Sequence, residues 1–116
     1  MHQELPASSS PLAGLVDVQA GSVVSRALVK RQTGTVTLFA FDAGEGLSEH
    51  EAPFEALVIG VEGAAEVTML GGVHQVHVGD LLRLPPRAPH ALRALTPFKM
   101  LLVMMRDPAP APRSAV

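Results

Sequence analysis

Short apolar runs rich in β-branched residues recur along the chain about every ten residues, and turn signals separate them. We expect eight or nine strands. Eight of them have clear ranges: 22–30, 34–41, 56–61, 65–70, 73–78, 81–84, 91–95 and 98–105. Turns are predicted at 31–34, at 43–46 and at 71–72, where a Gly-Gly pair suits a two-residue hairpin. No window of about twelve residues free of Gly and Pro shows a helical repeat. The pattern predicts an all-β fold, either a small barrel or a sandwich.

The two ends of the chain differ from this pattern. Residues 1–14 contain one acid and two prolines and lack the basic and apolar regions of a signal peptide, so we expect a mobile arm. Residues 107–116 alternate proline with small residues, which is typical of an extended, unpacked tail. The folded domain is therefore expected within residues 15–106.

Length and composition agree with one β-rich domain. The chain has 116 residues, enough for one core, and its 10 Gly and 10 Pro are more breakers than long helices tolerate. Nine basic and eleven acidic residues give a net charge of -2, which leaves no excess for a nucleic-acid or anionic membrane partner. The longest pure apolar run, 100–105, is far shorter than a membrane helix. We therefore expect a soluble protein.

Composition also limits the chemistry. The absence of cysteine excludes disulfides, thiolate metal sites and a cysteine nucleophile, and it is in keeping with a cytoplasmic location. Tyr and Trp are absent and there are four Phe, so recognition by aromatic stacking would depend on very few rings. Histidines and carboxylates remain as the candidate ligands.

Two segments resemble the paired motifs of the cupin superfamily. In the first, Gly44, His50 and Gly63 stand at the positions of the first Gly, the first His and the last Gly, but Ala52 and Ala56 replace the second His and the Glu.

In the second motif, Gly79, Pro85 and His90 match, whereas Arg87 replaces a Gly and Ala94 replaces an Asn. The resemblance implies a jelly-roll (double-stranded β-helix) barrel and places His50 and His90 on adjacent strands, pointing into one cavity. The family includes members without a metal, so function is not transferred with the fold.

The two histidines are the strongest candidates for a site. Two imidazoles suit one divalent metal ion such as zinc, iron, nickel, copper or manganese, but such sites usually have three protein ligands. Candidates for a third are Glu49, Glu51 and Glu55. Strand alternation turns them outward, although a bulge near Pro53 would re-aim Glu55. The alternative is that both histidines are neutral polar groups in a pocket without metal.

A ligand pocket is expected around the histidines, because alanines at ligand positions leave a wide apolar cavity. Its predicted lining is His50, Ala52, Ala56, His90, Leu92, Met100, Leu102 and Met104. For the last strand, the alternate set of residues is the other possibility.

Other polar residues are weaker candidates. His74 and His77 lie on opposite faces of one strand, so they cannot hold one ion together; His77 is expected to be exposed and His74 to lie near the barrel rim. Arg87 is a candidate clamp for a substrate carboxylate, and a solvated turn residue is the simpler interpretation. Arg83 and Arg93 are expected on the outer surface.

Three functions stay open at this point. The first is a small-molecule-binding barrel, with or without a divalent metal. The second is a metal-dependent enzyme of dioxygenase, isomerase or lyase type, which the missing Glu weakens for an iron oxygenase. The third is a non-catalytic sensing module, or a structural dimer with a vestigial pocket. Outward apolar residues at Leu57, Ile59 and Val61 favour a homodimer.

Overall fold

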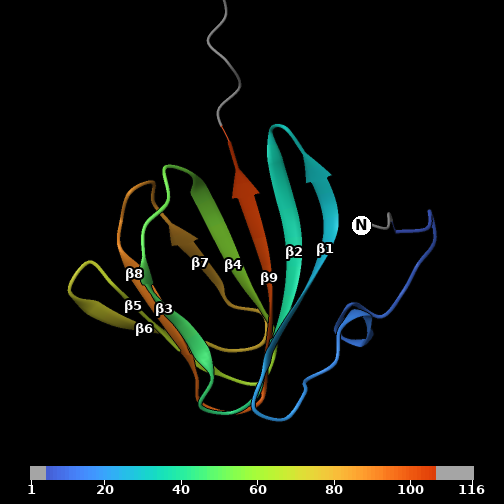
Figure 1. Ribbon diagram of the computed structural model, residues 1–116, viewed down its shortest axis with the longest axis horizontal. Helices are drawn as coiled ribbons and strands as arrows, with labels where there is room; N and C mark the ends of the chain where they lie inside the picture. The colour runs from blue at the N-terminus through green and yellow to red at the C-terminus, as the bar shows by residue number, and fades with distance from the viewer. Residues whose placement is uncertain (1–4, 107–116) are drawn as a thin grey trace, which may run out of the picture.

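The computed structural model describes residues 5–106 and contains nine strands and one short 3-10 helix, η1 (Figure 1). The elements are η1 (Leu12–Leu15), β1 (Val23–Arg31), β2 (Gly34–Phe41), β3 (Gly46–His50), β4 (Glu55–Glu62), β5 (Ala65–Met69), β6 (Gly72–Val76), β7 (Leu81–Leu84), β8 (His90–Ala94) and β9 (Phe98–Met105). The prediction of an all-β fold is confirmed.

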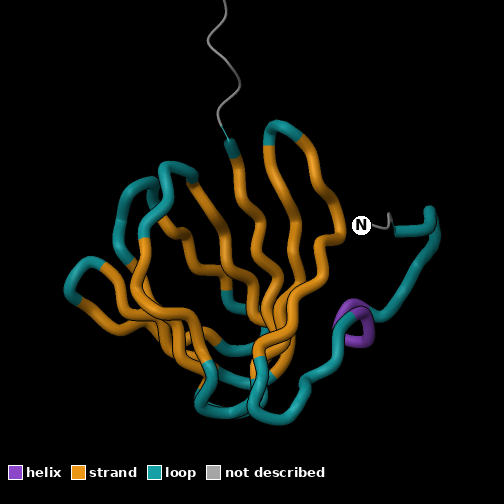
Figure 2. The backbone as a smooth tube through the Cα atoms, viewed as in Figure 1, coloured by secondary structure: helices purple, strands orange, loops and turns teal. Residues whose placement is uncertain are grey.

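The strands form two antiparallel sheets that face each other (Figures 1 and 2). One sheet has the order β1-β2-β9-β4-β7 and the other β3-β8-β5-β6, so neighbours in space are mostly distant in sequence. This crossing pattern is that of a jelly roll, as the motifs implied. Because alternate residues of each strand face the space between the sheets, the fold creates one interior.

One strand has no counterpart among the predicted ranges. Strand β3 contains a single large apolar residue, Leu47, and four of its five residues are exposed. It lies at the edge of its sheet and pairs with β8 alone. A strand with so little buried surface has no hydrophobic alternation to reveal it.

The hairpin between β5 and β6 turns one residue earlier than predicted. Met69 pairs with Gly72, so the two turn residues are Leu70 and Gly71 and not 71–72. Both have positive φ, 52° and 75°, as a type I′ turn requires. A branched residue such as Leu70 is strained in this left-handed conformation, and its side chain is 72% exposed.

Replacing Leu70 with asparagine is expected to raise the free energy of unfolding by about 0.5–1 kcal/mol, because Asn tolerates the left-handed conformation that costs other L-residues about 1–2 kcal/mol. Urea unfolding measures the difference. Leu70→Ala is the matched control: it removes the exposed apolar side chain but keeps an unfavourable Cβ, so little gain is expected. An equal gain in both variants would assign the effect to lost apolar surface.

The main core fills the interior between the two sheets. Phe41, Phe98, Val58, Val67 and Met100 are each at most 2% exposed and belong to this cluster. Phe41 contacts Phe39 and Phe98, with ring centroids 5.9 Å apart in both pairs. At the ends of β2 and β9, where these rings lie, the barrel is filled with side chains.

A second cluster covers the outer face of the larger sheet. Val16 and Leu28 pack there against Leu38 and Ala40 of β2. Val61, which we expected to face outward, packs against this cluster as well, whereas Leu57 and Ile59 are half-buried. Part of the face proposed for self-association is thus covered by the chain itself, and the homodimer stays a prediction.

Two basic side chains hold η1 on this outer face. Lys99, which is 8% exposed, donates to the carbonyl oxygen of Ala13 (2.7 Å), and Arg26 donates to that of Leu15 (3.1 Å). Lys99 also lies 3.5 Å from a carboxylate oxygen of Glu62. Within the expected arm, η1 is therefore tied to the sheet by hydrogen bonds. The mobility expected for residues 1–14 stays a prediction, and the predicted tail at 107–116 lies outside the described residues.

Within residues 5–106, no helix has the length and apolar character needed to cross a membrane.

Candidate functional site

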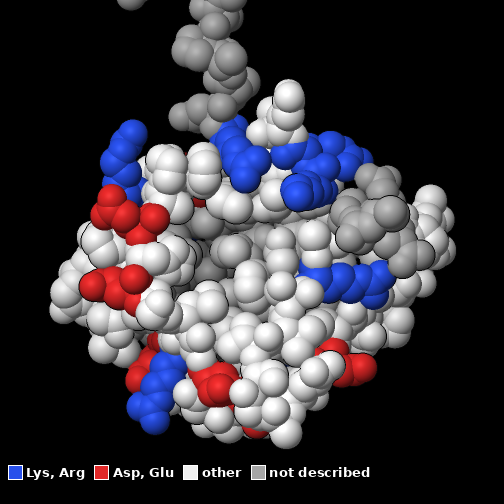
Figure 3. Space-filling model, viewed as in Figure 1, with Lys and Arg blue, Asp and Glu red and all other residues white. Residues whose placement is uncertain are grey.

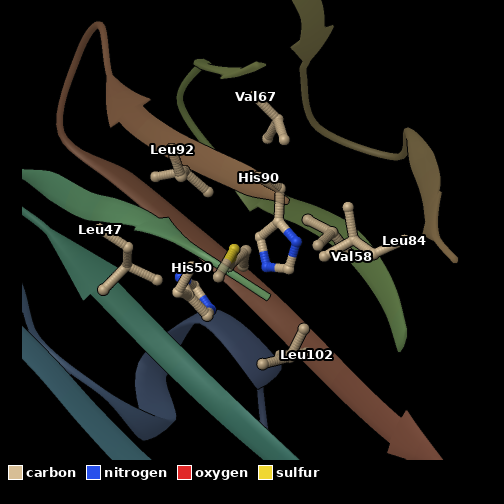
Figure 4. A pocket seen from close by; sticks show the side chains of 9 residues that line it. Leu47, His50, Val58, Val67, Leu84, His90, Leu92 and Leu102 are labelled. Atoms are coloured by element: carbon tan, nitrogen blue, oxygen red, sulfur yellow. The ribbon is translucent and has the colours of Figure 1, made fainter. Parts of the chain in front are cut away.

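A cavity opens between the sheets at the end of the barrel where β3, β8 and β9 bring His50, His90 and Met104 together. Its outer part has a volume of about 240 Å³, and a deeper part of about 40 Å³ continues toward the core. Figure 4 shows the deeper part, where aliphatic side chains surround the two imidazole rings. Figure 3 shows this face of the molecule hollowed near its centre, with uncharged side chains around the hollow.

The two histidines are direct neighbours. His50, the last residue of β3, pairs with His90, the first residue of β8. Their ring centroids are 4.4 Å apart and the ring planes make an angle of 66°, so one ring presents its edge to the other. Figure 4 shows the His90 ring pointing from its strand toward His50.

A β-bulge places His50 inward. Leu47 pairs with Leu92 and His50 with His90, so three steps along β3 match two steps along β8. The extra residue lets both Leu47 and His50 face the cavity, which regular alternation would forbid. The irregularity lies between Leu47 and His50, not near Pro53 as predicted.

Backbone carbonyls fix the tautomer of both rings. His50 Nδ1 lies 2.9 Å from the carbonyl oxygen of Ser48, and His90 Nδ1 lies 3.0 Å from that of Ala88. A carbonyl oxygen can only accept, so each Nδ1 carries the proton and donates it. In the neutral rings each Nε2 therefore keeps a free lone pair, available to a hydrogen-bond donor or a metal ion.

The candidate third ligands do not join the histidines. The carboxylate of Glu55 accepts a hydrogen bond from Arg83 of β7, a residue on the outer side of the sheet, so strand alternation holds and no bulge re-aims it. Glu49 and Glu51 are exposed and do not line the cavity. Among the described residues no three His, Cys, Asp or Glu side chains are grouped to hold a metal ion. The donor set thus does not fit a site with three protein ligands.

All eight residues of the predicted lining border the two parts of the cavity. His50, His90 and Leu102 line both parts. Ala52, Ala56 and Met104 line the outer part, and Leu92 and Met100 line the deeper part.

Sequence reasoning missed five lining residues. Four are aliphatic residues of the deeper cavity: Leu47, Val58, Val67 and Leu84. Val58 shares the inner face of β4 with Ala56, and Leu84 of β7 is the direct cross-strand partner of Ala56, so strand alternation and register identify both. The fifth, Phe54, precedes β4 and lines the outer cavity. Its position in a loop left no periodic signal.

The weaker candidates lie away from this cavity. His74 does not line either part, and the His77 side chain is 57% exposed, 3.5 Å from Asp80. Arg93 is exposed on β8, as expected for the outer surface.

Arg87, the predicted carboxylate clamp, is exposed in the turn before β8 and borders neither part of the cavity. Its φ is 62°, and its backbone N–H donates to the carbonyl oxygen of Ala52 (2.8 Å). The left-handed backbone explains why the motif has a Gly at this position.

Comparisons with known proteins agree with this geometry. The family model described as a cupin domain matches residues 37–104, which include the two motifs and most strands of both sheets. The chain belongs to the cupin family. No curated protein matches the sequence of this cupin.

Several solved structures are similar to this cupin over nearly its whole length. A conserved protein from Streptococcus pyogenes is 33% identical, with 90% of this chain and 92% of that chain covered and a TM-score of 0.85. A cupin superfamily protein from Desulfitobacterium hafniense is 30% identical, with 92% and 99% covered and a TM-score of 0.86. The DMSP lyase DddQ from Ruegeria pomeroyi is 24% identical, with 77% and 49% covered and a TM-score of 0.67, and shares the fold.

Proposed function

We propose that this cupin binds a small, mainly apolar organic molecule in the cavity between its sheets. The observation that carries the proposal is the pair of neighbouring imidazoles, His50 and His90, each held by a backbone carbonyl within an otherwise apolar cavity. Ligand sites have this composition, with apolar walls that supply affinity and a few fixed polar groups that supply orientation. A volume of about 240 Å³ lies just below the usual range of about 300–1,000 Å³ for ligand pockets, so the proposed ligand is a small molecule.

The two Nε2 atoms determine which kind of hydrogen-bonding group the ligand places beside the histidines. Both are acceptors in the neutral rings, so a hydroxyl, amide N–H or similar donor of the ligand is favoured there and a bare carboxylate is disfavoured. Ala52 and Ala56 provide the room, because their methyl groups stand where longer side chains would fill the outer cavity. In this proposal the protein is a binding or sensing module, and any signal would pass to a partner protein.

A metal ion on the same two nitrogens is the second candidate. Metal-bound histidines almost always donate their other ring nitrogen to a carbonyl or carboxylate, which is the arrangement of His50 and His90. Two imidazoles would hold zinc, iron, nickel or manganese weakly, and water or a ligand would complete the coordination. Catalysis of the dioxygenase, isomerase or lyase type depends on this second candidate, and no reaction step follows from two nitrogen ligands.

A thermal-shift screen of small phenols, alcohols, sugars and carboxylates tests the binding proposal. A compound present at about a hundred times its Kd is expected to stabilise the protein by about 2.7 kcal/mol, a shift of several degrees in Tm. The shift should be lost in His50→Ala and in His90→Ala. His77→Ala, an exposed histidine away from the cavity, is the control and should retain it. If no compound in a broad library raises the Tm, or if the shifts are retained in both His50→Ala and His90→Ala, the proposal is overturned.

Elemental analysis of protein purified without a histidine tag tests the metal candidate. After supplementation, the wild type should retain a first-row metal, and His90→Ala should lose it because one nitrogen ligand cannot hold the ion. Metal below about a tenth of an equivalent in the wild type would rule out the candidate. Equal uptake by His90→Ala would place the metal elsewhere.

A further inference from the structure

Arg106 continues the cavity-facing side of β9 beyond the end of the strand. Met100, Leu102 and Met104 face the cavity at alternate positions, and Arg106 is the next residue in that series. Its backbone N–H donates to the carbonyl oxygen of Thr33 (2.8 Å), which holds the residue against the turn between β1 and β2. The strand register thus places Arg106 next to Met104, beside the outer part of the cavity, although Arg106 is not itself one of the lining residues.

The guanidinium of Arg106 lies over an aromatic ring that lines the cavity. Its central carbon is 5.0 Å from the centroid of the Phe54 ring, a cation–π contact. Phe54 borders the outer cavity together with His50 and Met104. A ligand that fills the outer cavity against Phe54 would therefore come close to a positive charge.

One nitrogen of this guanidinium has no hydrogen-bond partner within residues 5–106. Arg106 is half-buried, its Nε atom is fully buried, and that atom has no hydrogen-bond partner there. No carboxylate in the described part of the chain pairs with it, in contrast to Arg83 with Glu55 and Lys99 with Glu62. An unpaired buried donor costs free energy, and a bound anion would recover it.

We propose that Arg106 binds the carboxylate of the ligand, and that the ligand class is therefore a small apolar monocarboxylate. The inference rests on the proposed binding function. The carboxylate pairs with Arg106 at the mouth, the apolar body lies against Phe54, Leu102 and Met104, and any hydroxyl or amide of the ligand reaches the two Nε2 acceptors. Arg106 suits this role because a guanidinium pairs with a carboxylate through two parallel hydrogen bonds.

The charge distribution supports entry of an anion at this end. Figure 3 shows Lys and Arg side chains gathered along the upper edge of the face that carries the hollow, whereas Asp and Glu lie mainly to the left and below. The lining of the cavity itself contains no charged side chain. The carboxylate would thus meet positive charge at the rim and none inside.

Titration calorimetry with matched probes tests the inference. The probes are phenylacetate and hexanoate, each compared with its neutral amide, phenylacetamide and hexanamide. In Arg106→Gln the carboxylates should bind about 10- to 100-fold more weakly, while the amides change by less than about twofold. Arg106→Lys should restore part of the carboxylate affinity, because it keeps the charge but not the planar fork. Thermal unfolding of each variant checks that the fold is retained.

Arg87→Gln is the matched control, since Arg87 is an exposed turn residue, whereas Arg106 lies over the Phe54 ring that lines the cavity. It should leave carboxylate binding unchanged. Equal carboxylate affinity in wild type and Arg106→Gln, or an equal loss in Arg87→Gln, would overturn the assignment of Arg106 while the amides still report the cavity. Failure of all four probes to bind the wild type would overturn both this assignment and the proposed function.

Discussion

Gly63→Ala is expected to lower the free energy of unfolding by about 2–5 kcal/mol. Gly63 has φ 73°, and a Cβ there would overlap the carbonyl oxygen of Pro97 and lie 2.7 Å from Oγ1 of Thr96. The left-handed conformation costs an alanine about 1–2 kcal/mol, and forcing an atom into packed structure costs about 1–3 kcal/mol more. Backbone cannot move aside as a flexible side chain can. Urea unfolding followed by circular dichroism measures the loss.

Gly44→Ala separates the two contributions. Gly44 has φ 84°, but no atom lies within 4 Å of a Cβ built there. Its substitution should therefore cost about 1–2 kcal/mol, from the backbone conformation alone. If the free energy of unfolding falls equally in the two variants, the close contact with Pro97 contributes nothing to the loss and the explanation for Gly63 is wrong.

These two glycines begin and end the first cupin motif, and they show why the fold could be predicted. Each of these glycines is required by the local backbone, because of a positive φ or a close backbone contact. This requirement remains when other residues replace the metal ligands of the motif. Ala52 and Ala56 stand at ligand positions without disturbing the spacing between Gly44 and Gly63. The fold and the position of His50 could therefore be inferred from sequence, although the chemistry could not.

Alternation along strands accounts for most of the predicted cavity. The motif placed Ala56 inward, and a repeat of two assigned one face of the last strand to the cavity, either that of Met100, Leu102 and Met104 or the alternate one. The structure puts Ala56 and the first of these two faces at the cavity. The same repeat explains Glu55, because an odd-numbered residue of regular β4 points outward, where Arg83 meets it. Predictions that depended on a regular strand match the structure at these positions.

The sequence did not predict the structure correctly where the backbone departs from regular strands and common turns. The bulge between Leu47 and His50 changes which residues face inward, and β3 has too few apolar residues to show the shift. The turn at Leu70 uses a residue that rarely adopts positive φ, so the Gly-Gly pair after it was the stronger signal. Arg106 follows β9, which ends at Met105 in the structure as predicted, so the residues assigned to the strand did not include it.

Three of the four phenylalanines lie at the core, and the fourth lies at the cavity. Phe41 contacts Phe39 and Phe98 at the main core, whereas Phe54 lines the cavity and contacts Arg106. In a chain without Tyr or Trp, the core rings are the largest side chains that exclude water from the interior. Loss of one of them should therefore affect stability much more than loss of Phe54.

Phe41→Ala is expected to lower the free energy of unfolding by about 3–5 kcal/mol. Phe41 is fully buried, and its removal leaves a cavity between Phe39 and Phe98 that these side chains fill only in part. Phe54→Ala is the matched control: Phe54 is half-buried beside an existing cavity, so its loss should cost no more than about 1–2 kcal/mol. Urea titration of the two variants with equal m-values gives the comparison. A Phe54→Ala protein that loses as much stability as Phe41→Ala would show that the mouth of the cavity, and not the rings between the sheets, holds the barrel together.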